Sequence, residues 1–337
     1  MTRSTTSVIE PGAIAIPRDR DGVTLDFGDR SVSLTNLRKP FWPALGITKG
    51  DLLRYYADIA PVIVPYLAGR AEVMKRYPHG ADGEFFYMKR TPSNKPDWLK
   101  TCSIEHGSGS VIAFPVIDDA ASLLWVINLG CIDLNEWYSR CDDTDRPDYL
   151  HFDLDPVKDG STTFSTVREV ALCVHEALEN LGIPAYAKTS GSSGIHIYVP
   201  IERGPLQKEV WTFAKAFAQT MERMHPNIIT AEYRVAKRPS GRVLVDYNQN
   251  AWGKTLASVY SVRAKPRATV SAPVAWDEIE AGIELEDFRL DNLRERLLRV
   301  GDLWEPMKAK KGRFQLERLL AGMPVKKRRR AQGPAND

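Results

Sequence analysis

Two aspartates at strand spacing are the first residues of this sequence that could do chemistry. Asp153 and Asp155 end the apolar stretch 149–155, which stops at Pro156. The two-residue period of a β-strand turns both carboxylates to one face, while Phe152 and Leu154 turn toward the core. Carboxylates this close repel each other, and a divalent cation is the natural way to keep both ionised. An isolated D-x-D pattern is also typical of two solvated acids on a surface strand.

A third aspartate ends another apolar stretch further along the chain. Asp246 follows Val243-Leu244-Val245 and could complete a cluster of three carboxylates from a neighbouring strand. Such a cluster can hold two divalent ions ~3.5–4 Å apart that bridge an attacking hydroxyl and a triphosphate. The alternative is an acid that caps the end of a strand.

A glycine turn lies between these two segments, in the stretch 189–198, Thr-Ser-Gly-Ser-Ser-Gly-Ile-His-Ile-Tyr. Its hydroxyls and backbone N–H groups, around Ser190 and Gly191, could wrap phosphate oxygens. His196 on the following strand would add a donor. Alone, such a turn is usually a hairpin and such a histidine a core residue.

The composition is that of a globular, intracellular protein. The 337 residues are 43% hydrophobic and 26% charged, with a net charge of +3. They contain no apolar run of the ~20 residues that would cross a bilayer and no secretory signal. The four cysteines lack the paired spacing of a zinc site or a disulfide framework. We expect no membrane partner and a cytoplasmic location. The basic run 326–330 is by itself typical of a solvated tail.

Patterning around these motifs predicts an α+β fold. We expect a hairpin over 23–34, a helix from Lys49 capped by Thr48 and running toward Pro61, and a second helix over 59–67. Strands are predicted at 111–114, 123–127, 149–155, 185–188, 195–199 and 242–247, and helices at 164–181 and 207–224. This succession indicates a mixed sheet with helices on one face, and beyond Pro273 the chain reads as helical.

The order of the three motifs, D-x-D, then S-G-x-x-G-x-H, then an aspartate after an apolar strand, resembles the archaeo-eukaryotic primase superfamily. The match is best to the polymerase domain of the bacterial DNA ligase LigD, which serves in nonhomologous end joining, and it covers roughly residues 30–305. The resemblance implies a primase-polymerase catalytic core with a mixed β-sheet and flanking helices over 31–305. It leaves an N-terminal arm over 1–30 and a basic tail over 306–337 that we expect to be disordered.

The resemblance also implies an activity and a site. The chain would be a template-dependent nucleotidyltransferase that adds nucleotides to a primer 3′-hydroxyl at short gaps or broken ends of DNA, with a tolerance or preference for ribonucleotides. Asp153, Asp155 and Asp246 would be catalytic and would bind two Mn²⁺ or Mg²⁺ ions. Lys39 and Lys49 would hold the 5′-phosphate of a downstream strand. The implied nucleotide-binding residues are Arg76, Phe86, Tyr87, His106, Ser190, Gly191, His196 and Arg263.

Three positions depart from the family pattern. Tyr87 replaces the second phenylalanine of a usual pair, and Asn135 stands where relatives often have histidine. Ser193 stands where many relatives have lysine, which would either weaken triphosphate binding or move that contact to Arg263 or Lys188.

The implied partners are gapped or broken DNA, nucleoside triphosphates, a DNA ligase and other repair proteins, in the bacterial nucleoid. The sequence contains no ligase lysine motif and no nuclease-like segment, and we therefore expect a stand-alone relative. Two other functions stay open. One is a primase that starts strands without a primer, and the other is a non-catalytic module that binds DNA ends.

Overall fold

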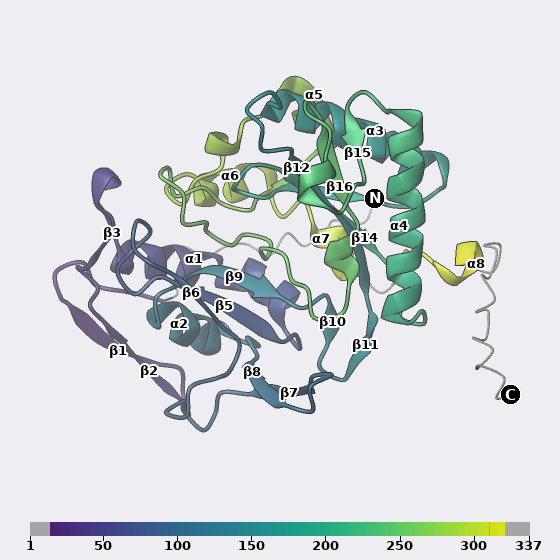
Figure 1. The fold of residues 1–337 in the computed structure, drawn as a ribbon. Helices are drawn as coiled ribbons and strands as arrows, with labels where there is room; N and C mark the ends of the chain where they lie inside the picture. The colour runs from purple at the N-terminus through teal and green to yellow at the C-terminus, as the bar shows by residue number, and fades with distance from the viewer. Residues whose placement is uncertain (1–13, 310, 321–337) are drawn as a thin grey trace, which may run out of the picture.

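The computed structural model describes residues 14–309 and 311–320, and it confirms the α+β class. Two groups of elements lie side by side (Figure 1). One is built on a six-stranded sheet from the second half of the chain, and the other combines two helices with several small sheets from the first half.

The six-stranded sheet is mixed and has the order β15-β16-β12-β14-β13-β17. Only β15 and β16 are parallel, and every other neighbouring pair is antiparallel. The strands are β12 (Tyr149–Pro156), β13 (Tyr186–Thr189), β14 (Ile195–Pro200), β15 (Ile229–Thr230), β16 (Val243–Asp246) and β17 (Pro273–Val274). The strands predicted at 149–155, 185–188, 195–199 and 242–247 are therefore confirmed.

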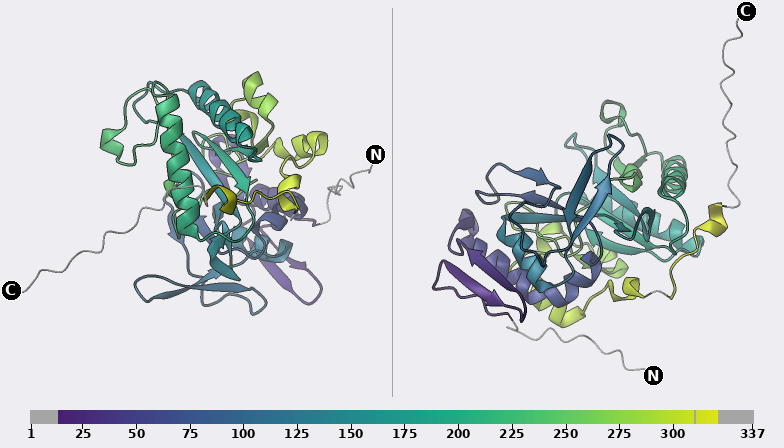
Figure 2. Two further views of the ribbon diagram at one scale, coloured as in Figure 1. Left: turned by 90° about the vertical axis from the view of Figure 1, so that its right-hand side faces the viewer. Right: turned by 90° about the horizontal axis from the view of Figure 1, so that it is seen from below.

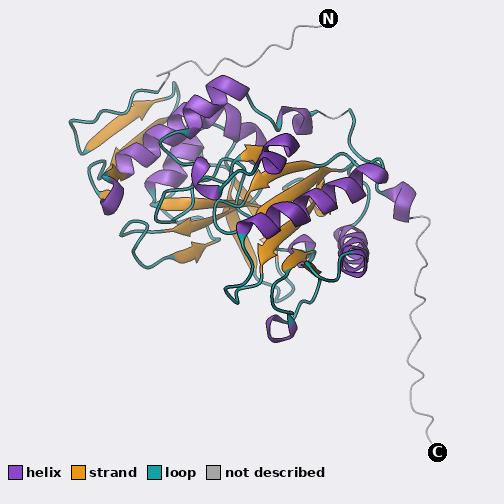
Figure 3. Cartoon of the chain, turned by 90° about the horizontal axis from the view of Figure 1, so that it is seen from above, coloured by secondary structure: helices purple, strands orange, loops and turns teal. Residues whose placement is uncertain are grey.

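Helices α3 (Phe164–Asn180) and α4 (Gln207–Met224) pack against this sheet, also as predicted. Phe152 of β12 lies 4.8 Å, between ring centroids, from Phe217 of α4, so the Phe152 face of the strand is the helix-covered one. Figure 2 shows the sheet and its helices from two further sides, and Figure 3 shows from above how the long helices lie over the strands. Because side chains alternate along a strand, Asp153 and Asp155 lie on the opposite face.

Helix α1 (Lys49–Leu67) corrects the expectation of two helices. Thr48 and Asp51 form the predicted N-terminal cap as a capping box, and the helix then continues through Pro61 and Pro65. Each proline removes a backbone hydrogen bond, but Ile59, Ile63 and neighbouring apolar side chains are fully buried. Tertiary packing therefore maintains a helix that the prolines alone would end.

The stretch 123–127 is also not the predicted strand, because it lies in helix α2 (Ala120–Asn128). Asp119 caps this helix in a capping box with Ser122. A short apolar run without periodicity fits a buried strand and a buried helix equally, so the cap was the signal that decided between them.

The remaining elements of the described residues are the strands of the small sheets, the later helices and four 3-10 turns. The predicted N-terminal hairpin is confirmed as β1 and β2, and the strand at 111–114 as β8. The strands are β1 (Gly22–Asp26), β2 (Ser31–Thr35), β3 (Pro40–Trp42), β4 (Ile47–Thr48), β5 (Glu72–Arg76), β6 (Phe86–Met88), β7 (Thr101–Glu105), β8 (Val111–Pro115), β9 (Cys131–Glu136), β10 (Ser139–Arg140) and β11 (Asp143–Pro147). The later helices are α5 (Trp276–Ala281), α6 (Leu293–Val300), α7 (Glu305–Lys308) and α8 (Glu317–Leu320), with 3-10 turns at η1 (Pro43–Leu45), η2 (Val235–Lys237), η3 (Asn248–Asn250) and η4 (Leu285–Asp287).

Both ends of the expected catalytic domain extend beyond their predicted limits. Ile16 and Leu25 belong to the main core, so the described part of the N-terminal arm packs with the domain. At the other end Met307 and Leu316 are fully buried, and Phe314 forms a parallel bridge with Ile201. Residues 306–309 and 311–320 are thus part of the fold and not a disordered tail. The predicted arm over 1–13 and tail over 321–337 lie outside the described residues.

Candidate active site

Strand register brings the three predicted aspartates together. Asp153 of β12 lies opposite Asp246 of β16 on one side and opposite His196 of β14 on the other. His196 in turn lies opposite Lys188 of β13. Cross-strand partners share a face of the sheet, so these four side chains form a row across four strands, which we call the acidic row. Asp155 lies two residues further along β12, on the same face.

The carboxylates of this row disturb each other's protonation. Burial and the neighbouring Asp246 raise the pKa of Asp153 to about 7. The charge of Asp153, together with burial, raises the pKa of Asp155 to about 7 as well. His196 Nε2 lies 3.2 Å from Asp153 Oδ1, yet that oxygen has no partner of hydrogen-bond geometry among the described residues. Buried, mutually repelling carboxylate oxygens are a donor set that suits Mg²⁺ or Mn²⁺.

The side chain of Asp246 is engaged elsewhere. Its Oδ1 accepts from Asn248 N at 2.8 Å, and its Oδ2 accepts from Gln249 Nε2 at 3.1 Å. Across residues 14–309 and 311–320, no three Asp, Glu, His or Cys side chains are arranged to hold a metal ion. The chemistry of these carboxylates fits a divalent cation, although their side chains are not arranged as a three-ligand site among the described residues.

Lys188 supports the row from inside the protein. Its Nζ is hydrogen-bonded to His196 Nδ1 at 2.7 Å, to Ala257 O at 2.8 Å and to Ser271 Oγ. Burial lowers the pKa of Lys188 to about 7, against the opposing effect of Glu136. All three ammonium donors are used inside the fold. Lys188 is therefore not free to take over a triphosphate contact in place of Ser193.

The glycine turn mainly positions strands. Ser190 Oγ accepts from the N–H groups of Ser192, Ser193 and Gly194, at 2.9–3.1 Å. These three N–H groups are thus occupied and do not form the expected phosphate cradle. A Cβ on Gly194 would lie 2.0 Å from the carbonyl oxygen of Leu154, so only glycine lets β14 approach β12 this closely. Gly191 has a φ of +64°, a region that favours glycine.

A pocket rich in cations adjoins this turn, and we call it the cationic pocket. Ser192 of the turn, Lys75 of β5, Arg263 and Lys265 line it, with Asp133 of β9. Tyr77 and Phe85 also line it. Asp133 Oδ2 lies 3.3 Å from Arg263 Nε and 3.6 Å from Lys75 Nζ, and Arg263 Nη1 donates to Ser190 O. The predicted Ser190, Gly191 and Arg263 are therefore brought together here. Asp133 and Lys265 were not singled out as site residues from the sequence.

A second pocket collects the residues predicted to bind a 5′-phosphate, and we call it the lysine pocket. Lys39, Lys49 and Arg76 line it together with Asn128 and others. Arg76 was expected at the nucleotide, but it lies with the two lysines. Lys75 and Arg76 are consecutive in β5, and the strand's alternation sends them to opposite faces.

The same alternation separates the predicted aromatic pair on β6. The Phe86 ring lies 5.2 Å from the Arg76 guanidinium, whereas Tyr87 lies 5.8 Å from Lys75 Nζ on the other side. Phe85 lies closer to Lys75, at 3.9 Å, and is half exposed. The two-residue period of strands β5 and β6 could have predicted from the sequence that consecutive residues lie on opposite faces.

Comparison with known proteins decides the family. The model of the LigD primase-polymerase domain matches residues 48–304. The chain belongs to this family.

Curated LigD proteins are similar over most of the chain. The multifunctional non-homologous end joining protein LigD of Mycolicibacterium smegmatis is 36% identical over 280 residues, which are 82% of this chain and 36% of that protein. The bifunctional LigD of Bacillus subtilis is 29% identical over 271 residues, 80% of this chain and 43% of that protein. The chain therefore spans well under half the length of these relatives.

A solved LigD structure shares the fold. The polymerase domain of Mycobacterium tuberculosis Ligase D, solved in complex with DNA, superposes with a TM-score of 0.77 at 31% identity. The alignment covers 83% of this chain and 98% of that one.

Two other positions of the LigD pattern lie apart from the acidic row. The His106 ring packs against Trp252 and Phe114, with centroid distances of 5.4 and 6.1 Å. Asn135 Nδ2 donates to backbone carbonyls within β5 and β9. None of the described contacts of either side chain reaches the acidic row, and a nucleotide contact by His106 stays a prediction.

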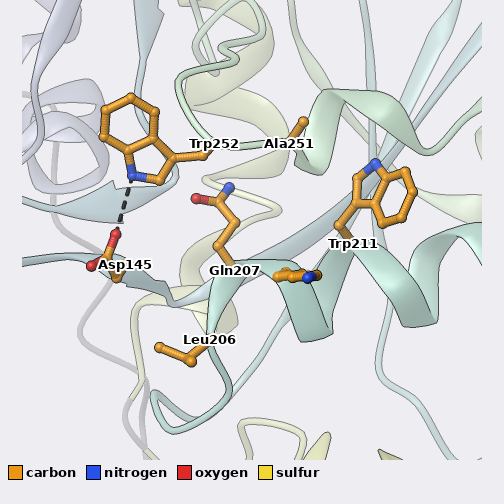
Figure 4. Close-up of a pocket in the computed structure, with 7 residues that line it drawn as sticks. Asp145, Leu206, Gln207, Trp211, Ala251 and Trp252 are labelled. Carbon is orange, nitrogen blue, oxygen red and sulfur yellow. Dashed lines mark hydrogen bonds between the residues drawn. The ribbon is translucent and has the colours of Figure 1, made fainter. Parts of the chain in front are cut away.

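Trp252 also lines a mostly apolar pocket at the start of α4 (Figure 4). The pocket is lined by Asp145, Leu206, Gln207, Lys208, Trp211, Ala251 and Trp252. Trp252 Nε1 donates to Asp145 Oδ1 at 3.2 Å across its mouth. None of the predicted site residues lines it. In the part of the chain that the structure describes, no helix is long and apolar enough to cross a membrane.

Proposed function

We propose that the chain is a template-dependent polymerase that adds nucleotides to a primer 3′-hydroxyl at short gaps or broken ends, in nonhomologous end joining. The observation that carries this proposal is the register that sets Asp246 opposite Asp153, with Asp155 on the same face. Membership of the LigD primase-polymerase family supports it, as does the DNA bound by the M. tuberculosis relative.

Asp153, Asp155 and Asp246 would hold two Mn²⁺ or Mg²⁺ ions. When bound, such ions neutralise charge and align the attacking hydroxyl with the triphosphate. Their binding would also relieve the repulsion that raises the pKa values of Asp153 and Asp155.

The cationic pocket would hold the triphosphate of the incoming nucleotide. Lys75, Arg263 and Lys265 supply positive charge beside the glycine turn, and charge-assisted hydrogen bonds are the strong ones. Asp133 holds Lys75 and Arg263 in place before the nucleotide arrives. Phe85 and Tyr87 present rings on which a base can stack. His196, fixed by Lys188, would present Nε2 toward the reacting phosphate.

The lysine pocket would recognise the 5′-phosphate on the far side of a gap. Lys39, Lys49 and Arg76 converge there from separate elements, and ammonium groups suit a compact dianion. A pocket for a downstream end favours gap filling over a primase that needs no end at all. We include a DNA ligase and other end-joining proteins as partners, because the curated relatives are named as multifunctional end-joining proteins.

Extension of a labelled gapped duplex tests this function. The wild-type protein, given Mn²⁺ or Mg²⁺, should add one templated nucleotide, with ribo- and deoxyribonucleotides compared and the downstream 5′-phosphate present or absent. The Asp153→Ala, Asp155→Ala double variant should lose extension but bind the duplex within a few-fold of wild type. Asp159→Ala, at a solvent-exposed aspartate just beyond β12, is the matched control and should still extend.

Extension at the normal rate by the double variant would place the chemistry elsewhere. Strand synthesis on a template without primer would establish the primase instead, and binding without any synthesis would establish the end-binding module.

A further inference from the structure

The side chain of Asn128, the last residue of α2, connects three parts of the lysine pocket. Its Oδ1 accepts from Lys49 Nζ at 2.8 Å and from Thr35 N at 3.0 Å. Its Nδ2 donates to Ser33 O at 3.1 Å. One amide therefore joins the end of α2, the hairpin strand β2 and the first residue of α1.

Lys49 is held by two hydrogen bonds on its ammonium group. Its Nζ donates to Asn128 Oδ1 and to Thr35 O, each at 2.8 Å. The residue is 5% exposed, yet it lines the pocket with Lys39 and Arg76. An ammonium group has three donors. Two are fixed by residues that the structure describes, and the third has no partner among them and is left for whatever enters the pocket.

The acceptor that fixes Lys49 is neutral, and this matters for an anion. Three charged residues from other parts of the chain act on the pKa of Lys49. Lys39 and Arg76 disfavour its protonated form, and Asp21 favours it. Burial, followed by Lys39, lowers the pKa of Lys49 to about 8. A carboxylate at position 128 would accept the same hydrogen bonds, but it would neutralise the ammonium and repel a phosphate.

We propose that Asn128 is a positioning residue for recognition of a terminal phosphate monoester, because its uncharged amide aims the Lys49 ammonium into the pocket without neutralising it. The proposal rests on the proposed function, in which this pocket takes a downstream 5′-phosphate. Arg76 is aimed by the same turn, since its Nε donates to Leu129 O at 2.7 Å. The end of α2 thus orients cations from both α1 and β5.

The test measures binding rather than synthesis. Full-length wild type, Asn128→Asp and Asn128→Ala are titrated with gapped duplexes that carry a downstream 5′-phosphate or a 5′-hydroxyl, at fixed ionic strength from pH 6.5 to 9.5. The quantity compared is the ratio of the two dissociation constants. Asn180→Asp is the matched control, because Asn180 is the exposed last residue of α3 and gains the same charge away from the pocket.

Wild type should prefer the phosphate, and the ratio should begin to fall as the pH rises past about 8, where Lys49 loses its proton. Asn128→Asp should reduce the ratio at pH 7 at least fivefold and should move its fall upward by about one pH unit or more, because the new carboxylate raises the pKa of Lys49. Asn128→Ala should reduce the ratio without that upward shift. Asn180→Asp should behave as wild type.

Two results would overturn the proposal. One is a wild-type ratio and pH profile in Asn128→Asp. The other is equal loss in Asn128→Asp and Asn128→Ala with no upward shift, which would limit Asn128 to holding the hairpin. A wild-type protein that binds both duplexes equally would instead remove phosphate recognition from the proposed function itself, so the two failures are distinguishable.

Discussion

Replacing Asp155 by asparagine should make the metal-free protein more stable while it abolishes nucleotide addition. Asp155 has its pKa raised from 3.8 to about 7, chiefly by the charge of Asp153. Asparagine has nearly the same shape, keeps an oxygen for the hydrogen bond from Ser193 Oγ, and removes the repulsion. The wild-type site is thus strained by charge in the absence of cations.

The sign and size follow from proton linkage. An acid whose pKa is raised on folding binds protons more tightly in the folded state, so stability falls as the pH rises from about 4 to about 7 and stays reduced above it. A shift from 3.8 to about 7 corresponds to at most about 4 kcal/mol. The pKa shifts of Asp153 and Asp155 arise in part from the same mutual repulsion, and the variant leaves Asp153 buried. We therefore expect the free energy of unfolding of Asp155→Asn to exceed that of wild type by roughly 1–3 kcal/mol at pH 8.

The assay is urea unfolding with a chelator at pH 5 and pH 8, repeated with Mn²⁺. Asp155→Asn should exceed wild type at pH 8 and approach it at pH 5, and Mn²⁺ should stabilise wild type more than the variant because a ligand of the folded state adds stability by mass action. Asp159→Asn is the control and should be less stable than wild type at pH 8, because hydrogen bonds from Ser240 and Ser161 hold the pKa of Asp159 well below its usual range. A variant less stable than wild type at pH 8 without metal would refute the reasoning.

Three further outcomes are expected. Arg263→Ala and Lys75→Ala should each raise the nucleotide Michaelis constant about tenfold or more in steady-state kinetics, since charge-assisted hydrogen bonds are worth ~1.5–3 kcal/mol. Unchanged Michaelis constants would exclude the cationic pocket as the triphosphate site. Gly194→Ala should lower the thermal midpoint and extension together, because its Cβ meets a carbonyl of β12 at 2.0 Å, whereas Gly107→Ala meets nothing within 4 Å and should do neither. Lys39→Ala should weaken the preference for a 5′-phosphate in binding titrations and leave extension of an open primer-template intact.

The sequence indicated Asp153, Asp155, Asp246 and His196 as site residues, but it did not specify the strand pairing that forms the acidic row. The alternation in β12 shows that Asp153 and Asp155 share a face, and this local pattern needs no partner strand. The position of Asp246 opposite Asp153 depends on a pairing between strands about 90 residues apart in the chain. Nothing local specifies that register, and only the order of the motifs indicated it.

The errors in the fold arose where local signals compete with packing. Pro61 predicted the end of a helix, but burial of the same segment carries α1 through it. The run 123–127 fits two structures locally, and α2 forms because of the cap at Asp119. This second error concerns the lysine pocket, because α2 ends at Asn128, whose side chain accepts a hydrogen bond from Lys49.

Two consecutive residues of β5 line two different pockets. Lys75 lines the cationic pocket, and Arg76, the next residue, lines the lysine pocket on the other face. Their Cα atoms are fixed about 3.8 Å apart by the peptide bond, so the two pockets cannot move independently of this strand. Under the proposed function, the incoming nucleotide and the downstream phosphate would be read from one rigid element. The spacing between them would then be set by the fold, which favours a gap of defined short length over one of variable length.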